Sequence, residues 1–362
     1  MIVTYITNAN DECNTRDSRP PKQGLSACGL IGHQLFFHQV VFCAALPDNT
    51  RMQVSSKVIT GFKNVLLVDY LAARFPYFSA KKWAALVTNG RLTHNGQTAT
   101  LATRVRQGDT IIYHMPDPEP PADWVVPIVY EDKWLLGVNK PAGLRVHSQG
   151  KFIAENLIYY LRYQHQPPFP DVNLVNRLDI HTSGVVVLAK DKQVLRQLSA
   201  DFAAGQVTKT YLAVVHGQPA PPSGVIELPL ARVPGTKTAR QQVVGAGEGK
   251  TVVTHYQLLE TLGADYALLQ LHPQTGRTHQ LRVHLAAIGH PIVGDGLYQL
   301  NDEDYLHWLR NGRSPQQMPL IQRQALHCAA TQFTHPVSGH PCQLEASLAD
   351  DMTQLIDKLS GN

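Results

Sequence analysis

The sequence predicts an α+β protein with a small αβ domain followed by a larger domain, in which helices flank a mixed, mainly antiparallel β-sheet around a central cleft. The chain has 362 residues, 43% of them hydrophobic, which is enough for two or three domains. Residues 116–127 hold five prolines and are typical of a semi-rigid linker. In residues 128–362, strand-like runs do not alternate strictly with helical stretches, which favours an antiparallel sheet over a doubly wound parallel one.

Residues 1–60 form an N-terminal extension whose role the sequence leaves open. No sustained helical or strand period runs through them. Met52 is an alternative start of the chain, which would make everything before it an added segment.

Cysteine usage and hydropathy indicate the compartment. The five cysteines are odd in number and none forms a C-x-x-C pair, which is typical of a reducing compartment. The longest apolar run near the N-terminus is too short and too polar to span a bilayer, and no signal-peptide pattern opens the chain. We therefore expect a cytoplasmic protein that makes no membrane contact.

Residues 61–115 form a small basic domain. It has seven Lys and Arg residues but only two Asp residues. This excess of positive charge is larger than the net charge of +4 of the whole chain. A basic module of this kind indicates a polyanionic partner such as nucleic acid, the alternative being a solvated charged face.

The elements of this domain follow from local signals. Leu67, Leu71 and Phe75 lie on one helical stripe, and Ser79 is a candidate N-cap for a second helix. The pair at residues 95–96, Asn-Gly, predicts a hairpin turn between short strands. This pattern resembles the small RNA-binding module named after ribosomal protein four of the small subunit, whose helix pair presents basic side chains to RNA.

Two opposite charges stand just before a buried strand in "LVNRLDIHTSGVVVLAKD". Arg177 and Asp179 flank one leucine there, ahead of the valines at 185–187. An Asp beside a core strand is costly unless it is paired. The pair is either a turn cap with a neighbouring Arg or a catalytic carboxylate at the floor of a cleft.

A helix is predicted over residues 278–288, because Gly289 and Pro291 follow it as stop signals. His279 and Arg282 are three residues apart and share a face. This edge is either an ordinary capped surface or a rigid mount that brings a guanidinium to a cleft.

Several motifs, taken in order, carry a resemblance to a known family. They are "VNKPAGLRVHS", "NRLDIHTSGVVVLAK", "KTYLAVVHG", "GKTVVTHYQLLE", "PQTGRTHQLRVHLAAIGHPIVGD" and "LHCAATQFTHP". Together they resemble the RluA-type RNA pseudouridine synthases over residues 62–348. One departure is Asn176, where the family usually has His; the Arg and Asp that follow remain.

The resemblance implies the isomerisation of uridine in RNA, without cofactor or metal. Asp179 would be the catalytic carboxylate, which either attacks the anomeric carbon or removes the neighbouring ribose proton. Arg282 would keep it ionised against the effect of burial. Tyr211, which from its strand alone is an ordinary core tyrosine, would stack on the uracil and is a candidate to accept the ring-carbon proton. Arg177 would replace the extruded uridine in the RNA stack.

A glycosidase is the alternative for chemistry at a glycosidic bond. Most such enzymes place two carboxylates around the bond. The matched motifs contribute Asp179 and no second acid, which favours isomerisation.

RNA is therefore the expected partner, and large-subunit ribosomal RNA the expected substrate. The basic residues Lys81, Lys82 and Arg91 of the small domain, with Asn176 and Arg177, are the predicted RNA contacts. The alternatives are a transfer-RNA pseudouridine synthase and a non-catalytic RNA-binding protein of ribosome assembly on the same fold. We expect a monomer.

Overall fold

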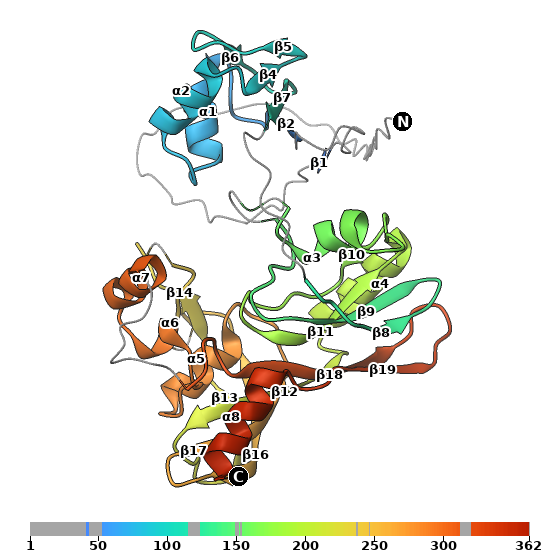
Figure 1. Cartoon of the computed structure of the whole chain (residues 1–362), viewed down its shortest axis with the longest axis vertical. Helices are drawn as coiled ribbons and strands as arrows, with labels where there is room; N and C mark the ends of the chain where they lie inside the picture. Colours follow the sequence, from blue (N-terminus) through green and yellow to red (C-terminus); the bar gives the residue numbers. More distant parts are fainter. Residues whose placement is uncertain are drawn as a thin grey trace, which may run out of the picture.

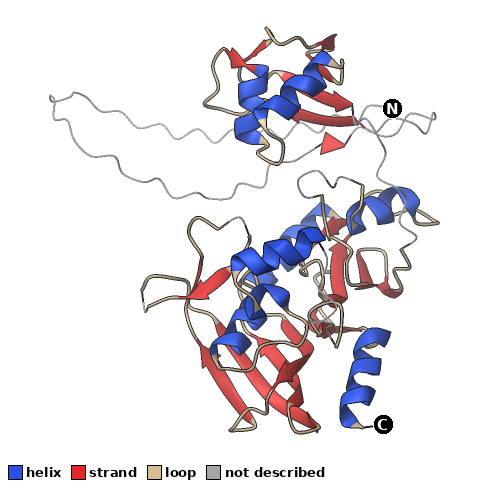
Figure 2. Cartoon of the chain, turned by 60° about the vertical axis from the view of Figure 1, so that its left-hand side comes forward, coloured by secondary structure: helices blue, strands red, loops and turns tan. Residues whose placement is uncertain are grey.

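The structure is a computed structural model in which two units are visible, a small N-terminal domain and a larger one (Figures 1 and 2). It describes residues 41–42, 53–114, 124–148, 152, 154–236, 238–245, 247–311 and 320–361. Among these residues no helix is both long and apolar enough to cross a membrane. Most of the N-terminal extension, including its three cysteines, lies outside the described residues.

The small domain packs two helices against short antiparallel strands. Its main sheet has the order β1 (Val41–Phe42), β2 (Gln53–Lys57), β7 (Thr110–His114), β4 (Leu92–His94) and β5 (Gln97–Thr98), and β3 (Val65–Leu66) pairs with β6 (Arg104–Val105). The helices are α1 (Leu67–Arg74) and α2 (Ala80–Thr88). Since β2 pairs along its length with β7, the domain includes residues before the boundary at 61 that the sequence suggested.

Local signals account for these elements. The Ser79 side chain accepts a hydrogen bond from the amide of Lys82 at 3.3 Å, which caps α2. Asn95 and Gly96 both adopt a positive φ, as a two-residue hairpin turn between β4 and β5 requires. Trp83 is buried in the core that α1 and α2 form with the sheet.

The larger domain is built on one ten-stranded sheet. The order is β13 (Ser223–Glu227), β16 (Val253–Leu262), β17 (Tyr266–Pro273), β12 (Thr208–His216), β18 (Leu326–Thr334), β11 (Ser183–Ala189), β9 (Leu135–Lys140) and β8 (Ile128–Glu131), while β10 (Asn173–Leu174) pairs with β11 and β19 (Pro341–Glu345) with β18. Every pairing is antiparallel except that of β11 with β18. The predicted mixed, mainly antiparallel sheet is therefore confirmed.

Helices and one small hairpin surround this sheet. They are α3 (Leu157–Tyr159), which continues into a π-helix over Tyr160–Gln164, α4 (Lys192–Ala203), α5 (Gln280–Ala287), α6 (Gly296–Gln299), α7 (Asp302–Asn311) and α8 (Asp350–Ser360). The strands β14 (Leu230–Arg232) and β15 (Gln241–Val243) pair with each other outside the main sheet. Figure 1 shows this hairpin on the same side of the domain as α5, α6 and α7.

The large domain also begins earlier than expected. The predicted linker ends at residue 127, yet Val126 is buried and packs into the hydrophobic core of the domain. Residues 116–123, which hold most of the prolines, lie outside the described residues.

Two hydrophobic clusters meet near the centre of the sheet, at β12 and β18. One gathers around β9, β11 and α4, and the other around β12, β17, α5 and α8. Tyr211 packs against both clusters. The parallel contact between β11 and β18 is limited to Ser183 with His327 and Gly184 with Cys328. The seam between the two clusters is where the candidate catalytic residues lie.

Candidate active site

Asp179 lies in the loop that leads into β11. Its side chain is 30% exposed, and its backbone carbonyl accepts a hydrogen bond from the amide of Thr182 at 3.1 Å. This closes the turn ahead of Gly184, whose φ is +112°. A Cβ at Gly184 would lie 2.2 Å from the carbonyl oxygen of Cys328, so only glycine lets β11 approach β18 this closely.

Lys140 binds the backbone of the loop that carries Asp179. Its side chain is fully buried, and its Nζ donates to the carbonyls of Pro141, Leu144 and Ile180 at 2.7, 2.9 and 3.2 Å. Ile180 is the residue next to Asp179. The amine therefore joins the end of β9 to the loop and fixes the backbone that carries the carboxylate.

Arg282 brings the opposite charge from α5. Its Nη1 donates to Asp179 Oδ2 at 2.9 Å. The same guanidinium binds Asp295 in a bidentate manner, with Nε to Oδ2 at 2.6 Å and Nη2 to Oδ1 at 2.8 Å. Arg282 therefore links two carboxylates that lie on either side of it, and the predicted pairing of Asp179 with Arg282 is present in the structure.

Electrostatics favour an ionised Asp179. Burial raises its pKa, but His279, in the acid range where its own imidazole is charged, and Arg282, which is charged throughout, outweigh burial and hold the pKa below its usual value. Burial also lowers the pKa of His279 to about 4, so its imidazole is neutral near pH 7. Arg282 is thus the main cation that keeps Asp179 ionised at neutral pH, and Arg177 adds a smaller effect of the same sign.

Tyr211 lies on β12 at an irregularity of the sheet. The register between β12 and β18 shifts between Thr210 and Tyr211, a bulge of the kind that redirects a side chain beside an active site. Burial first, then Cys328 and the charge of Asp179, raise the pKa of Tyr211 well above its usual value. The hydroxyl therefore stays protonated in the free protein, which supports stacking more directly than proton acceptance.

The side chains of Arg177 and Asn176 make different kinds of contact. Arg177 is exposed, and its Nη2 donates to the Thr278 hydroxyl at 2.9 Å, at the edge of the site. The Asn176 side chain accepts from the buried amide of Val187 at 2.8 Å. Asn176 thus holds the loop on β11, which gives its unexpected position before Arg177 a structural reason.

The predicted RNA contacts of the small domain lie around α2. Lys81 and Lys82 are exposed in the first turn of α2, and Arg91 is partly exposed just after it. They share a domain, and their role in RNA binding stays a prediction.

The sequence reasoning missed two features of the site. Asp295 ends the motif "HPIVGD", but nothing in its pattern told it apart from a loop Asp; it is 1% exposed and fully engaged by Arg282, so it is not a second catalytic acid. The predicted helix at 278–288 begins at Gln280 instead, because His279 adopts a left-handed conformation with φ 55°. His279 Nε2 nevertheless lies 3.8 Å from Asp179 Oδ2, so His279 and Arg282 both face the carboxylate.

Comparisons with known proteins now bear on this site. Residues 135–287 match the family model described as RNA pseudouridylate synthase, a span that includes Asp179, Tyr211 and Arg282. The ribosomal large subunit pseudouridine synthase D of Zymomonas mobilis is 33% identical over 302 residues, which cover 80% of this chain and 92% of that protein. The chain belongs to the RNA pseudouridine synthase family.

Two further relatives agree with this assignment. An uncharacterized RNA pseudouridine synthase of Bacillus subtilis is 32% identical and covers 83% of this chain and 96% of its own length. The structure of human RNA pseudouridylate synthase domain containing 4 is 30% identical, covers 64% of this chain and 92% of its own, and superposes with a TM-score of 0.51. This RNA pseudouridine synthase is therefore an isomerase, as the sequence motifs predicted, and RNA is its substrate.

Proposed function

We propose that this pseudouridine synthase isomerises uridines of large-subunit ribosomal RNA, with Asp179 as its catalytic carboxylate. The main support for the catalytic role is the 2.9 Å hydrogen bond between Arg282 and Asp179, whose carboxylate is partly exposed. The substrate follows from relatives that are named ribosomal large subunit pseudouridine synthases in Zymomonas mobilis and Xanthomonas campestris. A cytoplasmic, monomeric enzyme is part of the same proposal.

The reaction needs no external reactant. The bond between uracil N1 and ribose C1′ breaks, the base turns, and C5 bonds to C1′. The proton that C5 loses is balanced by the proton that N1 gains, so substrate and product are isomers. An ionised Asp179 can act either on C1′ or on the ribose proton beside it, and both routes need the charge that Arg282 maintains.

Tyr211 and Arg177 complete the proposed site. The Tyr211 ring lies at the seam of the two hydrophobic clusters and offers an aromatic face to the uracil. Arg177 is exposed beside Asp179 in the sequence and is suited to fill the space that an extruded uridine leaves in the RNA. The small domain would add phosphate contacts through Lys81, Lys82 and Arg91.

Release of tritium from RNA labelled at uracil C5 tests the proposal. Transcribed large-subunit RNA and transfer RNA are offered separately to the purified protein and to Asp179→Asn. We expect release from ribosomal RNA by the wild type and a loss of at least about 1,000-fold in Asp179→Asn, with RNA affinity retained.

Asp265→Asn is the matched control, because it also replaces a carboxylate by an amide. Asp265 is exposed in the turn between β16 and β17. It should keep the wild-type rate. Release from transfer RNA alone would overturn the substrate, whereas undiminished release by Asp179→Asn would overturn the catalytic role. Binding of ribosomal RNA without any release would support the assembly-protein alternative instead.

The contribution of the small domain is tested by salt. Lys81→Gln with Lys82→Gln removes two charges that would release counterions from RNA. The slope of log affinity against log salt should become shallower by about 1 to 2. An unchanged slope would show that these two residues do not contact RNA.

A further inference from the structure

His279 occupies a costly conformation at a position next to the candidate catalytic carboxylate. Its φ of 55° is uncommon for a residue other than glycine, and a conformation of this kind persists only where surrounding contacts enforce it. Its Nε2 lies 3.8 Å from Asp179 Oδ2, at the opposite side of the ring from its hydrogen-bonded Nδ1. The contacts of Nδ1 therefore decide what Nε2 presents to Asp179.

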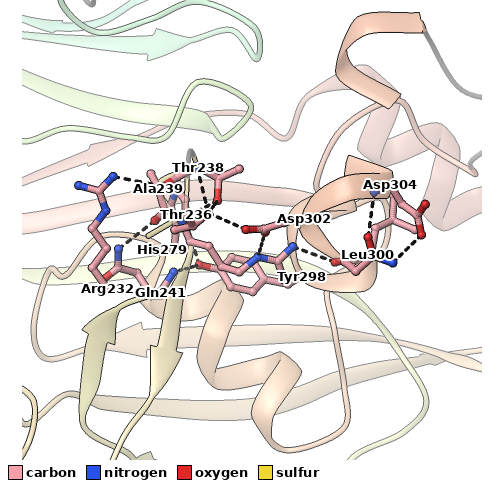
Figure 3. A network of polar contacts seen from close by, with 12 residues as sticks. Arg232, Thr236, Thr238, Ala239, Gln241, His279, Tyr298, Leu300, Asp302 and Asp304 are labelled. Carbon is pink, nitrogen blue, oxygen red and sulfur yellow. Dashed lines mark hydrogen bonds and ion pairs between the residues drawn. The ribbon is translucent and has the colours of Figure 1, made fainter. Parts of the chain in front are cut away.

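A chain of hydrogen bonds reaches His279 from the β14–β15 hairpin (Figure 3). The backbone amide of Gln241 donates to the Tyr298 hydroxyl at 3.0 Å. That hydroxyl lies 2.9 Å from His279 Nδ1, and the two rings meet edge to face with centroids 5.7 Å apart. Tyr298 thus connects a strand of the hairpin with the residue that faces Asp179.

The direction of these hydrogen bonds can be assigned from their donors. A backbone N–H can only donate, so the Tyr298 oxygen accepts from Gln241 and has its own proton to give. His279 is neutral near pH 7, because burial lowers its pKa to about 4, and so it carries one ring proton. When Tyr298 donates to Nδ1, that proton is on Nε2, the atom that faces Asp179.

The Tyr298 ring itself contacts two guanidinium groups. The guanidinium carbon of Arg282 lies 5.1 Å from its centroid and that of Arg240 lies 5.7 Å away. Arg240 in turn donates through Nη2 to the carbonyl of Leu300 at 2.8 Å and through Nε to Asp302, which anchors the hairpin to the start of α7. The hairpin, Tyr298 and the charged pair at Asp179 form one connected network.

We propose that His279 is a positioning residue for the catalytic carboxylate: Tyr298, oriented by the Gln241 amide, fixes the imidazole so that Nε2–H points at Asp179. Together with Arg282, this donor orients the carboxylate toward the ribose. The hairpin then supports the catalytic carboxylate through the backbone amide of Gln241. The inference rests on the proposed role of Asp179.

Two replacements of His279 separate this role from backbone strain. The side-chain amide nitrogen of Gln reaches about as far as Nε2, whereas that of Asn reaches only about as far as Nδ1. Asn tolerates the left-handed conformation better than Gln does. A positioning role therefore predicts that His279→Gln outperforms His279→Asn, and a purely structural role predicts the reverse.

The single-turnover rate with saturating enzyme gives the readout. We expect His279→Gln to stay within about 3-fold of the wild type and His279→Asn to fall by about 10- to 100-fold, the effect of losing a polar donor that faces the carboxylate at 3.8 Å and closes on it when substrate is bound. RNA affinity should change in neither. His290→Gln is the control, since His290 lies beyond α5 and bonds the carbonyl of His216.

Tyr298→Phe tests the other end of the network by spectroscopy. The ring keeps its contacts with Arg282 and Arg240, but the proton given to Nδ1 is lost. The ¹⁵N chemical shifts of His279 should show the Nε2–H form in the wild type and a mixture of both forms in Tyr298→Phe, with a fall in rate of about 3- to 10-fold. Tyr256→Phe, which removes a hydroxyl bonded to the carbonyl of Pro221, should change neither reading.

The outcomes distinguish this inference from the proposed function. Full activity in Asp179→Asn would overturn the catalytic assignment and the inference with it. If Asp179→Asn is inactive, the inference alone is overturned by equal rates of the two His279 variants, by a faster Asn variant, or by an Nδ1–H form in the wild type. The ¹⁵N measurement needs only folded protein, so a poorly active variant is still informative.

Discussion

Two regions of the large domain meet at the candidate site, and they are held in different ways. The loop over residues 176–184 is fixed mainly to backbone: Asn176 bonds an amide, Lys140 bonds three carbonyls, and Gly184 lets β11 touch β18. The segment over residues 279–298 is fixed by side-chain charge. Its Arg282 is bound on one side by a carboxylate of its own segment, Asp295.

The difference explains why one guanidinium serves two carboxylates. Asp295 is 1% exposed and is bound by two nitrogens, whereas Asp179 is 30% exposed and is bound by one. The buried partner fixes the direction of the guanidinium before any substrate arrives. The remaining nitrogen then meets a carboxylate that still has surface open to react. A preorganised charge of this kind needs no rearrangement during the reaction.

The largest effect on stability is expected for Asp295→Asn. Removing one partner of a buried ion pair costs about 3–5 kcal/mol, because the remaining charge stays buried. Asp179→Asn changes a partly exposed, singly bound group and should cost much less. Urea unfolding of the three proteins measures the difference.

Asp351→Asn is the matched control for burial. Asp351 binds Arg323 in the same bidentate manner, with two contacts of 2.7 Å, but is 47% exposed. Its replacement should cost less than that of Asp295, because water reaches Asp351 and because the buried Arg323 keeps its hydrogen bonds to the carbonyls of Gln324 and Leu326. Equal losses in Asp295→Asn and Asp351→Asn would show that burial does not set the strength with which Arg282 is held.

Sequence patterns were sufficient to identify the two charged residues that meet at the site. Asp179 and Arg282 could be identified because each stood beside an apolar strand or helix stripe, in motifs that follow a family order. Their separation of 103 residues is bridged by the sheet, which the family resemblance implied but no local pattern could show. The Ser79 cap and the hairpin turn at residues 95–96 were equally predictable, because both signals are local.

Features that depend on tertiary contacts were not predictable. The helix was expected to start near residue 278, yet His279 is left-handed, and its ring contacts Tyr298 and lies beside Asp179. Asp295 looked like any loop Asp, since only the fold brings Arg282 to it. The role of Asn176 also required the structure, because the amide that it accepts from lies on a strand eleven residues away.

Gly184→Ala addresses the support of the loop and should have the next largest effect. The new Cβ would meet the carbonyl oxygen of Cys328 at 2.2 Å, and the φ of +112° is unfavourable for any other residue. We expect a loss of about 2–4 kcal/mol in the free energy of unfolding, from strain and overpacking together.

The control for Gly184→Ala is Gly289→Ala, at the end of α5. Gly289 also has a positive φ, of +85°, but nothing lies within 4 Å of its Cβ position. The loss there should be only about 1 kcal/mol. If both variants lose the same amount, the close approach of β11 to β18 does not constrain the loop.

The pH dependence of turnover tests how the segment over residues 279–298 changes the pKa of Asp179 in the loop over residues 176–184. The pKa of Asp179 is held below its usual value, so its ionised form persists above that value and is lost only as pH falls through the lowered pKa. The single-turnover rate should therefore stay constant on the acid side from pH 7 to 5.

Arg282→Lys should shift this acid limb upward by about one pH unit, because one ammonium cannot satisfy Asp295 and Asp179 together. Rates measured from pH 4 to 8 in both proteins give the comparison. An acid limb at the same pH in both would mean that the two-sided binding of Arg282 does not set the charge of Asp179.

The smallest effect is expected at Asn176. Asn176→Ala leaves the buried amide of Val187 without its acceptor and should cost about 1 kcal/mol in unfolding free energy. Asn176→His, which introduces the residue usual in the family, can accept the same hydrogen bond through a ring nitrogen and should stay within about 0.5 kcal/mol of the wild type.

RNA affinity decides between this support of the loop by Asn176 and the predicted contact of Asn176 with RNA. If Asn176→Ala weakens RNA binding while unfolding is unchanged, Asn176 contacts RNA; loss of stability with unchanged affinity assigns it to the mount of Asp179.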